Sequence, residues 1–227
     1  MRNPWLDLSV SPPFILAEDA TRVEAFNRRA SETSRVHVEL LPEPFLGDPN
    51  APVVILGLNP SFSTYDLEAH SRPVFACLSR ANLRHESGSF PFYLLNPTVE
   101  SPGRLWWEQR LARLLEVAPR EVVAHRILCI EYFPYHSVKF NHHRLELASQ
   151  QYAFYLVRQA MRREAIVILM RSPRRWYSAV PELETYKQLF KLRNPQSAWI
   201  SRGNCPNGFD FVLDALDVPA SLRPRSH

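Results

Sequence analysis

A glycine, an asparagine and a proline follow the first long apolar run of the sequence. Gly57, Asn59 and Pro60 lie in the stretch APVVILGLNPSFS, residues 51–63. Proline restricts the preceding residue to extended conformations, so a stiff turn presents the Asn59 side chain. An asparagine amide oxygen accepts a hydrogen bond from water and can hold that water against an electrophilic carbon. The stretch therefore indicates a site that positions water or, alternatively, an Asx turn that caps the loop.

Arginine residues gather in the C-terminal half of the chain. Residues 156–176 contain six arginines and one acid, Glu164. Arg171, Arg174 and Arg175 lie beside aromatic residues in this segment. Guanidinium groups bind phosphates through paired hydrogen bonds and stack on bases, so the segment is typical of a nucleic-acid contact. The alternative is a solvated helix end and loop.

Short apolar runs alternate with helical patterns along the chain. The runs that predict strands buried on both faces are 52–58, 126–133, 165–170 and 197–201. Segments 104–117 and 143–163 repeat apolar residues every three or four positions, which predicts amphipathic helices. A further strand is predicted near 36–40. This alternation predicts an α/β fold with a mostly parallel sheet and helices on both faces.

Two of the six glycines follow predicted strands. Gly57 ends the first strand, and Gly203 lies just past the last one. Ligands of open α/β sheets bind beyond the carboxyl ends of the strands, where backbone and ligand come close together. We therefore expect a site where these glycines meet. The alternative is that each glycine supplies a positive φ in a tight turn.

Length and composition predict one domain. The chain has 227 residues, of which 45% are hydrophobic, enough for a sizeable core. Within a single domain over 1–227, we expect a core over 52–216, an N-terminal extension over 1–35 and a frayed tail over 220–227. The oligomeric state is left open.

The composition also bears on location and cofactors. The longest purely apolar run, 165–170, is far shorter than the roughly 20 residues that cross a bilayer, and the chain starts without a signal-peptide pattern. We therefore expect a cytoplasmic protein with no membrane partner. Cys77, Cys129 and Cys205 are odd in number and widely spaced, which argues against disulfides and metal–sulfur centres. We expect no metal and no cofactor, whereas the net charge of +4 is compatible with DNA as a partner.

The stretch VVILGLNPSFS resembles the first signature of the uracil-DNA glycosylase superfamily, a strand followed by G-x-[DN]-P. Its asparagine form is most similar to the mismatch-specific and thymine-DNA glycosylase branch. This resemblance implies a three-layer α/β/α sandwich and hydrolysis of the N-glycosidic bond of a base flipped out of DNA. It also implies that Asn59 orients the hydrolytic water. Ser61 departs from the glycine common at that place.

The resemblance also implies a second signature, a His-Pro-Ser or Asn-Pro-Ser loop after the last core strand. With 197–201 as that strand, the loop is expected at residues 201–204, where no histidine occurs. Ser201, the Gly203 amide and Asn204 would bind a phosphate there. The sequence NPQS at 194–197 precedes the predicted strand, so we do not assign it this role.

Recognition of the base is expected from the second strand and a neighbouring aromatic segment. Family members often carry an asparagine that reads the base where this chain has Glu131. An ionised carboxylate repels a carbonyl oxygen, so Glu131 predicts an amino-bearing or damaged base. His136 can supply the missing imidazole, or it is structural. Phe92 or Tyr93 would stack on the base, or both belong to the core.

The candidate residues fall into three groups. The catalytic candidates are Asn59 and His136. The substrate-binding candidates are Gly57, Leu58, Pro60, Ser61, Phe62, Phe92, Tyr93, Glu131, Ser201, Gly203 and Asn204. The nucleic-acid-binding candidates are Arg171, Arg174, Arg175 and Arg202.

Two alternatives to a DNA glycosylase stay open. One is a non-catalytic nucleic-acid-binding relative, which the missing histidine favours. The other is a protein of the same fold that binds or hydrolyses a small nucleotide, since fold does not determine function.

Overall fold

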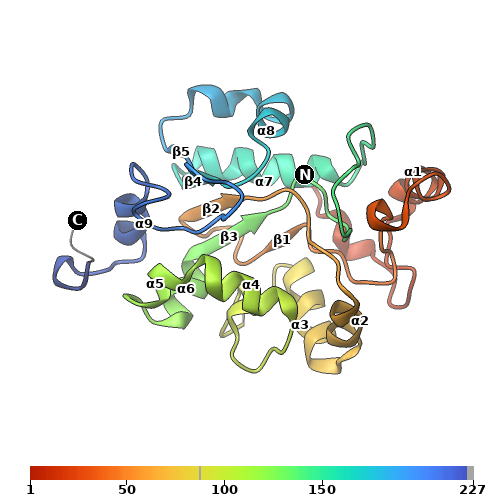
Figure 1. The fold of residues 1–227 in the computed structure, drawn as a ribbon, viewed down its shortest axis with the longest axis horizontal. Helices are drawn as coiled ribbons and strands as arrows, with labels where there is room; N and C mark the ends of the chain where they lie inside the picture. Colours follow the sequence, from red (N-terminus) through yellow and green to blue (C-terminus); the bar gives the residue numbers. More distant parts are fainter. Residues whose placement is uncertain (87, 224–227) are drawn as a thin grey trace.

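A computed structural model describes residues 1–86 and 88–223. Five strands form one sheet in the order β1-β3-β2-β4-β5 (Figure 1). The strands are β1 (Phe45–Leu46), β2 (Val53–Leu56), β3 (Ile127–Ile130), β4 (Ile166–Leu169) and β5 (Leu189–Lys191). Strand β1 pairs antiparallel with β3, and the other neighbours are parallel. The fold is therefore α/β with a mostly parallel sheet, as predicted.

The three central strands are the most apolar segments of the chain. Strands β2, β3 and β4 have the sequences VVIL, ILCI and IVIL, and every residue in them is buried. In the register, Val53 pairs with Ile127 on one side and with Ile166 on the other. Branched side chains suit a pleated sheet that is covered on both faces. The strands predicted within 52–58, 126–133 and 165–170 are confirmed.

Helices connect the strands and precede or follow the sheet. The α-helices are α1 (Ala17–Asn27), α2 (Thr64–Ser71), α3 (Pro73–Leu83), α4 (Pro102–Arg110), α5 (Ala112–Leu115), α6 (Arg120–Arg126), α7 (Gln150–Arg162), α8 (Pro173–Ala179) and α9 (Phe209–Ala215). The 3₁₀ helices are η1 (Pro4–Asp7), η2 (Glu32–Ser34), η3 (Tyr93–Leu95), η4 (Pro181–Thr185) and η5 (Ala220–Leu222). The helix predicted over 104–117 is divided at Leu111 into α4 and α5, and the one predicted over 143–163 begins only at Gln150. Within the described ranges, no helix is long and apolar enough to cross a membrane.

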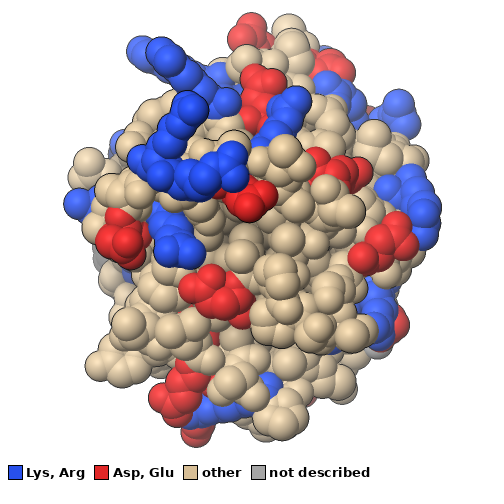
Figure 2. Space-filling view, turned by 90° about the vertical axis from the view of Figure 1, so that its right-hand side faces the viewer, with Lys and Arg blue, Asp and Glu red and all other residues tan. Residues whose placement is uncertain are grey.

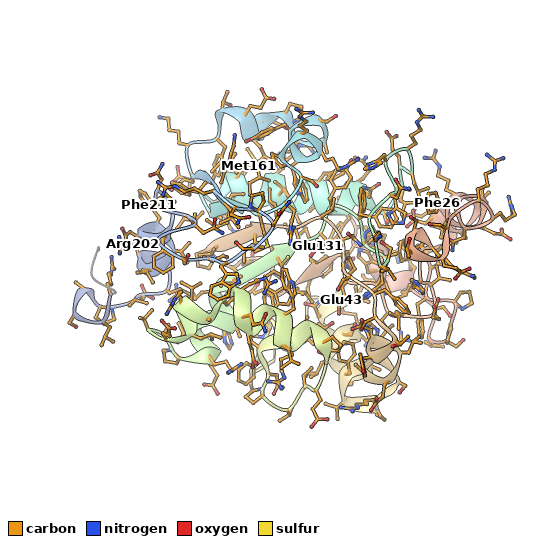
Figure 3. All side chains as sticks on the ribbon, in the orientation of Figure 1. Phe26, Glu43, Glu131, Met161, Arg202 and Phe211 are labelled. Atoms are coloured by element: carbon orange, nitrogen blue, oxygen red, sulfur yellow. The ribbon has the colours of Figure 1, made fainter. Side chains whose placement is uncertain are left out.

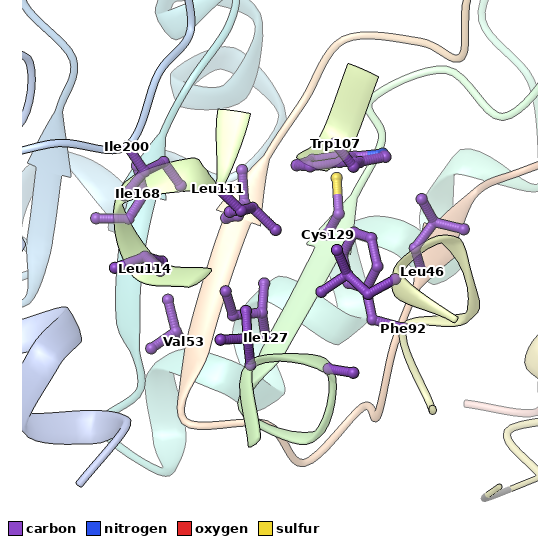
Figure 4. Close-up of a cluster of buried hydrophobic side chains, with 14 of the residues drawn as sticks. Leu46, Val53, Phe92, Trp107, Leu111, Leu114, Ile127, Cys129, Ile168 and Ile200 are labelled. Carbon is purple, nitrogen blue, oxygen red and sulfur yellow. The ribbon is translucent and has the colours of Figure 1, made fainter. Parts of the chain in front are cut away.

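Helices cover both faces of the sheet (Figure 1). Alternate residues of a strand point to opposite faces. Ile55 belongs to the buried cluster that includes Trp107 of α4, which Figure 4 shows in part. Leu56 belongs to the cluster on the other face, with Val157 of α7 and Trp176 of α8. Burying one large aliphatic side chain contributes about 1.5–3 kcal/mol, so these two clusters hold the layers together.

The indole of Trp176 also ties α8 to the turn after β2. Its side chain is fully buried, and its Nε1 donates a hydrogen bond to the Gly57 carbonyl oxygen at 2.8 Å. A buried indole N–H usually finds such a partner, because leaving it unpaired is costly. The short helix α8 is thereby fixed to the first strand's carboxyl end.

Two predicted strands are wrong. Residues 197–201 form no strand, although Ala198 and Ile200 are fully buried, because this segment packs into the core without pairing to the sheet. The last strand is β5, an edge strand whose residues are only partly buried. The segment 36–40 makes a single bridge, between His37 and His136, and the antiparallel edge strand is β1 instead.

The first residues of the chain pack onto the domain, whereas residues 220–222 near its other end are exposed. Within the predicted extension 1–35, Trp5, Leu16 and Val23 are buried in the same cluster as β2 and α7. In the predicted tail, residues 220–222 form η5, and Arg223 donates hydrogen bonds to the Val218 carbonyl oxygen. The part of the predicted tail over 224–227 lies outside the described residues.

Candidate functional site

A cavity of about 400 Å³ lies at the carboxyl ends of three parallel strands. It is lined by residues 57–61 after β2, Glu131 after β3, and Met170 and Arg171 after β4. Figure 3 shows Glu131 and Glu43 at the end of the sheet near α2. This is the edge where open α/β sheets bind ligands, and the volume is in the range of small-molecule sites, about 300–1,000 Å³.

The cavity brings together part of the predicted site. The predicted residues that line it are Gly57, Leu58, Asn59, Pro60, Ser61, Glu131, His136 and Arg171. The predicted residues that do not line it are Phe62, Phe92, Tyr93, Arg174, Arg175, Ser201, Arg202, Gly203 and Asn204. Residues 57–61 and the end of β3 thus meet, whereas the loop expected at 201–204 does not line the cavity.

Asn59 is held by its amide nitrogen. Nδ2 donates to the Pro60 carbonyl oxygen at 2.8 Å and to the Ser137 hydroxyl at 3.0 Å. These two bonds determine which way the amide is turned, and they leave Oδ1 with no hydrogen-bond partner among residues 1–86 and 88–223. An amide oxygen can only accept. Asn59 therefore offers a fixed acceptor beside the cavity, and the contact to its own main chain does not use up the side chain.

Glu131 is the most unusual carboxyl of the cavity wall. Its side chain packs directly on Gly57, where a Cβ atom would lie 2.2 Å from Oε2. Glycine is required there because any larger residue would displace the carboxyl. Burial raises the pKa of Glu131 to about 8, which opposes the smaller effect of the Cys129 thiol contact at 3.6 Å. At neutral pH this carboxyl is mostly protonated.

His136 is buried and structural. Its Nδ1 lies 2.6 Å from the Ser61 carbonyl oxygen, and its Nε2 lies 3.1 Å from the Leu41 carbonyl oxygen. Carbonyl oxygens only accept, so both bonds form together only when the ring carries two hydrogens. Both nitrogens are then engaged by the backbone. The expectation that His136 supplies an imidazole to the ligand is not supported by this geometry, although the residue lines the cavity.

A second histidine, His70 of α2, also lines the cavity. Its Nδ1 accepts a hydrogen bond from the Leu41 amide at 3.2 Å, so the neutral ring carries its hydrogen on Nε2. Burial and the neighbouring His136 lower the pKa of His70 to about 2. His70 is therefore a neutral donor, and no hydrogen-bond partner for Nε2 occurs within the described residues. Sequence reasoning missed it, because nothing in the spacing of TYDLEAHS marks it as part of a site.

Glu43 completes a buried group of titratable side chains. One ligand atom each from Glu43, His70 and His136 lie within 4.8 Å of one another. Burial raises the pKa of Glu43, and Oε1 accepts a hydrogen bond from the Tyr93 hydroxyl at 2.7 Å. A metal needs imidazole lone pairs, but that of His70 faces the Leu41 amide and both nitrogens of His136 face carbonyls. The hydrogen bonds thus fit a polar network better than a metal centre.

The predicted stacking rings belong to the core. Phe92 is fully buried and meets Trp107 edge to face, while Tyr93 is buried and holds Glu43. Phe62 instead stacks on His37, outside the cavity. The aromatic side chains that line the cavity are Phe75, Trp106, Trp107 and Phe140. Trp106 and Phe140 are only partly buried, so they can face a ligand.

Side-chain hydrogen bonds and an ion pair hold the loop at 201–204 in place. Asn204 Nδ2 donates to the carbonyl oxygens of Asn194 and Trp199, at 3.2 and 2.8 Å, and its Oδ1 accepts from the Asn194 amide at 2.6 Å. Arg202 pairs with Asp210 of α9. Both polar atoms of the Asn204 side chain are therefore hydrogen-bonded to the main chain.

The segment that follows the last strand is the one at 194–197. Because β5 ends at Lys191, the sequence NPQS comes after it and not before it. The Asn194 side chain caps this turn by accepting from the Gln196 amide at 3.0 Å. Arg171 donates from Nη2 to the Gln196 carbonyl oxygen at 3.3 Å, which joins the segment to a residue of the cavity wall.

Basic side chains surround one side of the cavity. Arg171 lines it, and the guanidinium of Arg175 lies 5.1 Å from the ring centre of Phe140, another lining residue. Arg174 is exposed on the same helix, α8. Figure 2 shows Lys and Arg side chains gathered toward the upper left of the face that carries α1 and α2. Cations at a cavity rim favour anionic ligands.

Comparisons with known proteins returned no match: neither a family model, nor a curated protein, nor a solved structure is similar to this chain.

Proposed function

We propose that this chain is a DNA glycosylase-like enzyme that hydrolyses the N-glycosidic bond of an extruded, deaminated or damaged base. The resemblance of residues 53–63 to the first signature of the uracil-DNA glycosylase superfamily motivates the proposal. The single observation that carries it is the orientation of Asn59 at the cavity. Its Nδ2 is engaged by Pro60 and Ser137, so only the accepting oxygen remains for water.

The proposed reaction needs little from the protein except positioning. The water oxygen bonds to C1′ of the sugar, the C1′–N bond breaks, and its electron pair leaves with the base. The water proton passes to solvent or to the departing base. An amide cannot remove a proton, so the base must depart early, before the water has lost one. Asn59 would hold the water, and His70 Nε2–H is a neutral donor for negative charge developing on the base.

The position of the sequence NPQS supports the same proposal. The second signature of the superfamily is an Asn-Pro-Ser-type loop after the last core strand, and residues 194–197 follow β5. The loop differs in having Gln196 where a serine would be expected. Its link to Arg171 brings it to the rim of the cavity.

The arginines and aromatic rings suit an extruded nucleotide. Flipping a base out of the stack costs a few kcal/mol, and stacking on an aromatic ring returns about 1–3 kcal/mol. Phe140 and Trp106 are the candidate rings, in place of Phe92 and Tyr93. Arg175, beside Phe140, is placed to meet a phosphate of the same strand.

The test is abasic-site formation. Oligonucleotides that contain uracil, hypoxanthine, xanthine or a mismatch are incubated with the protein and then treated with alkali. We expect cleavage with the wild type and at least a roughly 100-fold lower rate with Asn59→Ala, because misplacing a reactant costs on that order. Asn50→Ala is the matched control, since Asn50 is exposed just before β2, at the opposite edge of the sheet.

The outcomes separate the proposal from its alternatives. Salt-sensitive binding of oligonucleotides without any cleavage would identify a non-catalytic binding protein, a possibility that the engaged ring of His136 favours. Tight binding of a free nucleoside with weak binding of oligonucleotides would identify a small-nucleotide protein. Equal rates for Asn59→Ala and the wild type would refute the assigned role of Asn59.

A further inference from the structure

We propose that a second, basic groove binds a single DNA strand next to the nucleotide in the cavity. The basic groove lies between the end of α1 and the loop 138–149, and its volume is about 610 Å³. The residues that line it include Phe26, Arg29, His143 and Arg144. This inference rests on the proposed function for its ligand, an oligonucleotide, and adds a site that holds the strand outside the cavity.

The basic groove carries positive charge without a compensating acid. Among the described residues that line it there is no aspartate or glutamate. Arg29 and Arg144 are exposed, and neither forms an ion pair within residues 1–86 and 88–223. By contrast Arg28, the neighbour of Arg29, pairs with Glu24 at 3.7 Å. An unpaired guanidinium is free to form paired hydrogen bonds with a phosphate, so the charge of the groove suits a polyanion.

Aromatic and basic side chains connect the basic groove with the cavity. Phe140 lines the cavity, and its ring meets the His143 ring edge to face at 5.8 Å between ring centres. His143 lines the groove and contacts the guanidinium of Arg175, which lies 5.1 Å from the ring centre of Phe140. Figure 2 shows Lys and Arg side chains gathered on the face that carries α1. A strand whose extruded nucleotide occupies the cavity can therefore continue past Arg175 into the groove.

The size of the basic groove and its aromatic ring suit one strand. A volume of about 610 Å³ is in the range of small-molecule sites, so the groove admits a short stretch of one strand and not a double helix. Phe26 of α1 lines the groove and is only partly buried (Figure 3). Its ring centre lies 4.9 Å from that of His142, a buried residue of the loop 138–149. Proteins that bind single strands combine a positively charged groove with aromatic rings on which bases stack.

The experiment measures how salt weakens the binding of DNA. Fluorescent oligonucleotides of about 15 nucleotides, within the range of single-strand site sizes, are used as single strands and as duplexes of the same sequence. Anisotropy at a series of salt concentrations gives the slope of log affinity against log salt for the wild type and for Arg29→Gln combined with Arg144→Gln. Each phosphate contact contributes about 0.7 to the magnitude of this slope for a single strand. We expect the double variant to lower the magnitude by about 1.4 on the single strand, because two contacts are lost, and to leave the slope on the duplex unchanged.

The matched control is Arg162→Gln combined with Lys187→Gln, which removes the same charge. Arg162 ends α7 just before β4, and Lys187 precedes β5, so both lie at the amino ends of the strands, away from the cavity. All four replaced side chains are exposed and make no hydrogen bond with another described residue, so we expect both double variants to fold. Circular dichroism checks this.

Each result decides between inference and function. Equal slopes for the groove variant and the control on the single strand overturn the inference, even if abasic sites form in the cleavage assay. Equal weakening of single-strand and duplex binding by the groove variant also overturns it, because the arginines then act only by general electrostatic attraction. A lower slope on the single strand alone supports the inference. If the wild type shows this behaviour but forms no abasic sites, the proposed function fails and the strand-binding groove stands.

Discussion

The hydrogen bonds of a single residue decide what it can contribute to the cavity. The sequence predicts His136 as a catalytic residue. In the structure, however, both of its ring nitrogens face backbone carbonyl oxygens, which leaves neither nitrogen for a ligand. His70, which the sequence does not mark as a site residue, lies on α2. Its Nδ1 accepts a hydrogen bond from the Leu41 amide, so its Nε2–H is available to a ligand. The lowered pKa of His70 means that this donor stays uncharged throughout the physiological range.

We expect His70→Phe to slow abasic-site formation about 10- to 100-fold, because a hydrogen bond to a charged group is worth about 1.5–3 kcal/mol. Phenylalanine keeps an aromatic ring against Phe75, which meets His70 at 4.4 Å between ring centres. The rate is measured under single-turnover conditions. His125→Phe is the matched control, because His125 is exposed on α6. If His70→Phe and the control react at equal rates, His70 has no role in the reaction.

At the scale of elements, the predictable strands are those with both faces covered. Strands β2, β3 and β4 are uninterrupted apolar runs because helices cover both sides of them. Strand β5 lies at the edge of the sheet and ends on an exposed lysine, so its three residues carry no such run. Residues 197–201 are apolar for a different reason, since they fill the core without pairing. A burial pattern alone cannot distinguish these cases.

The misplaced last strand had a direct effect on the predicted site. It moved the expected loop to 201–204 and removed 194–197 from consideration. Gly57, Asn59 and Glu131 were found because each follows a recognisable strand. His70 and the lining rings Trp106 and Phe140 reach the cavity from helices and a loop, and only tertiary packing determines which of their side chains point inward. The strand ends of such a site are therefore predictable, and its helical wall is not.

We expect Asn204→Ala to lower the free energy of unfolding by about 2 kcal/mol, because three hydrogen bonds, each worth about 0.5–1.5 kcal/mol net, are lost. Urea denaturation measures the change. Asn207→Ala is the control, since Asn207 is exposed in the same loop. An Asn204→Ala variant with unchanged stability but weaker binding of oligonucleotides would restore the phosphate-binding role.

At the scale of the whole molecule, buried groups with opposite pKa shifts affect stability in opposite directions. The pKa values of Glu131 and Glu43 are raised by burial, so their contribution is lost as pH rises above their unfolded value of 4.5. The pKa values of His70 and His142 are lowered by burial to about 2 and about 4, so their contribution is lost as pH falls below 6.5. Between these limits the two effects oppose each other.

We therefore expect the protein to be most stable between about pH 4.5 and 6.5, and to lose stability as pH rises to about 8. Each group contributes a slope of up to about 1.4 kcal/mol per pH unit. Urea denaturation at a series of pH values gives the curve, and Glu131→Gln should flatten its alkaline side. A free energy of unfolding that rises steadily from pH 5 to pH 8 would contradict this expectation.

The hydrogen bond from Trp176 to the Gly57 carbonyl has a consequence for how a long polyanion would lie on the molecule. The helix that carries the indole also carries Arg174 and Arg175. The hydrogen bond therefore joins α8 and the turn that carries Asn59 into one rigid unit. If the proposed reaction takes place at Asn59, we expect this fixed separation to determine how many nucleotides lie between a phosphate bound by Arg174 or Arg175 and the sugar that reacts.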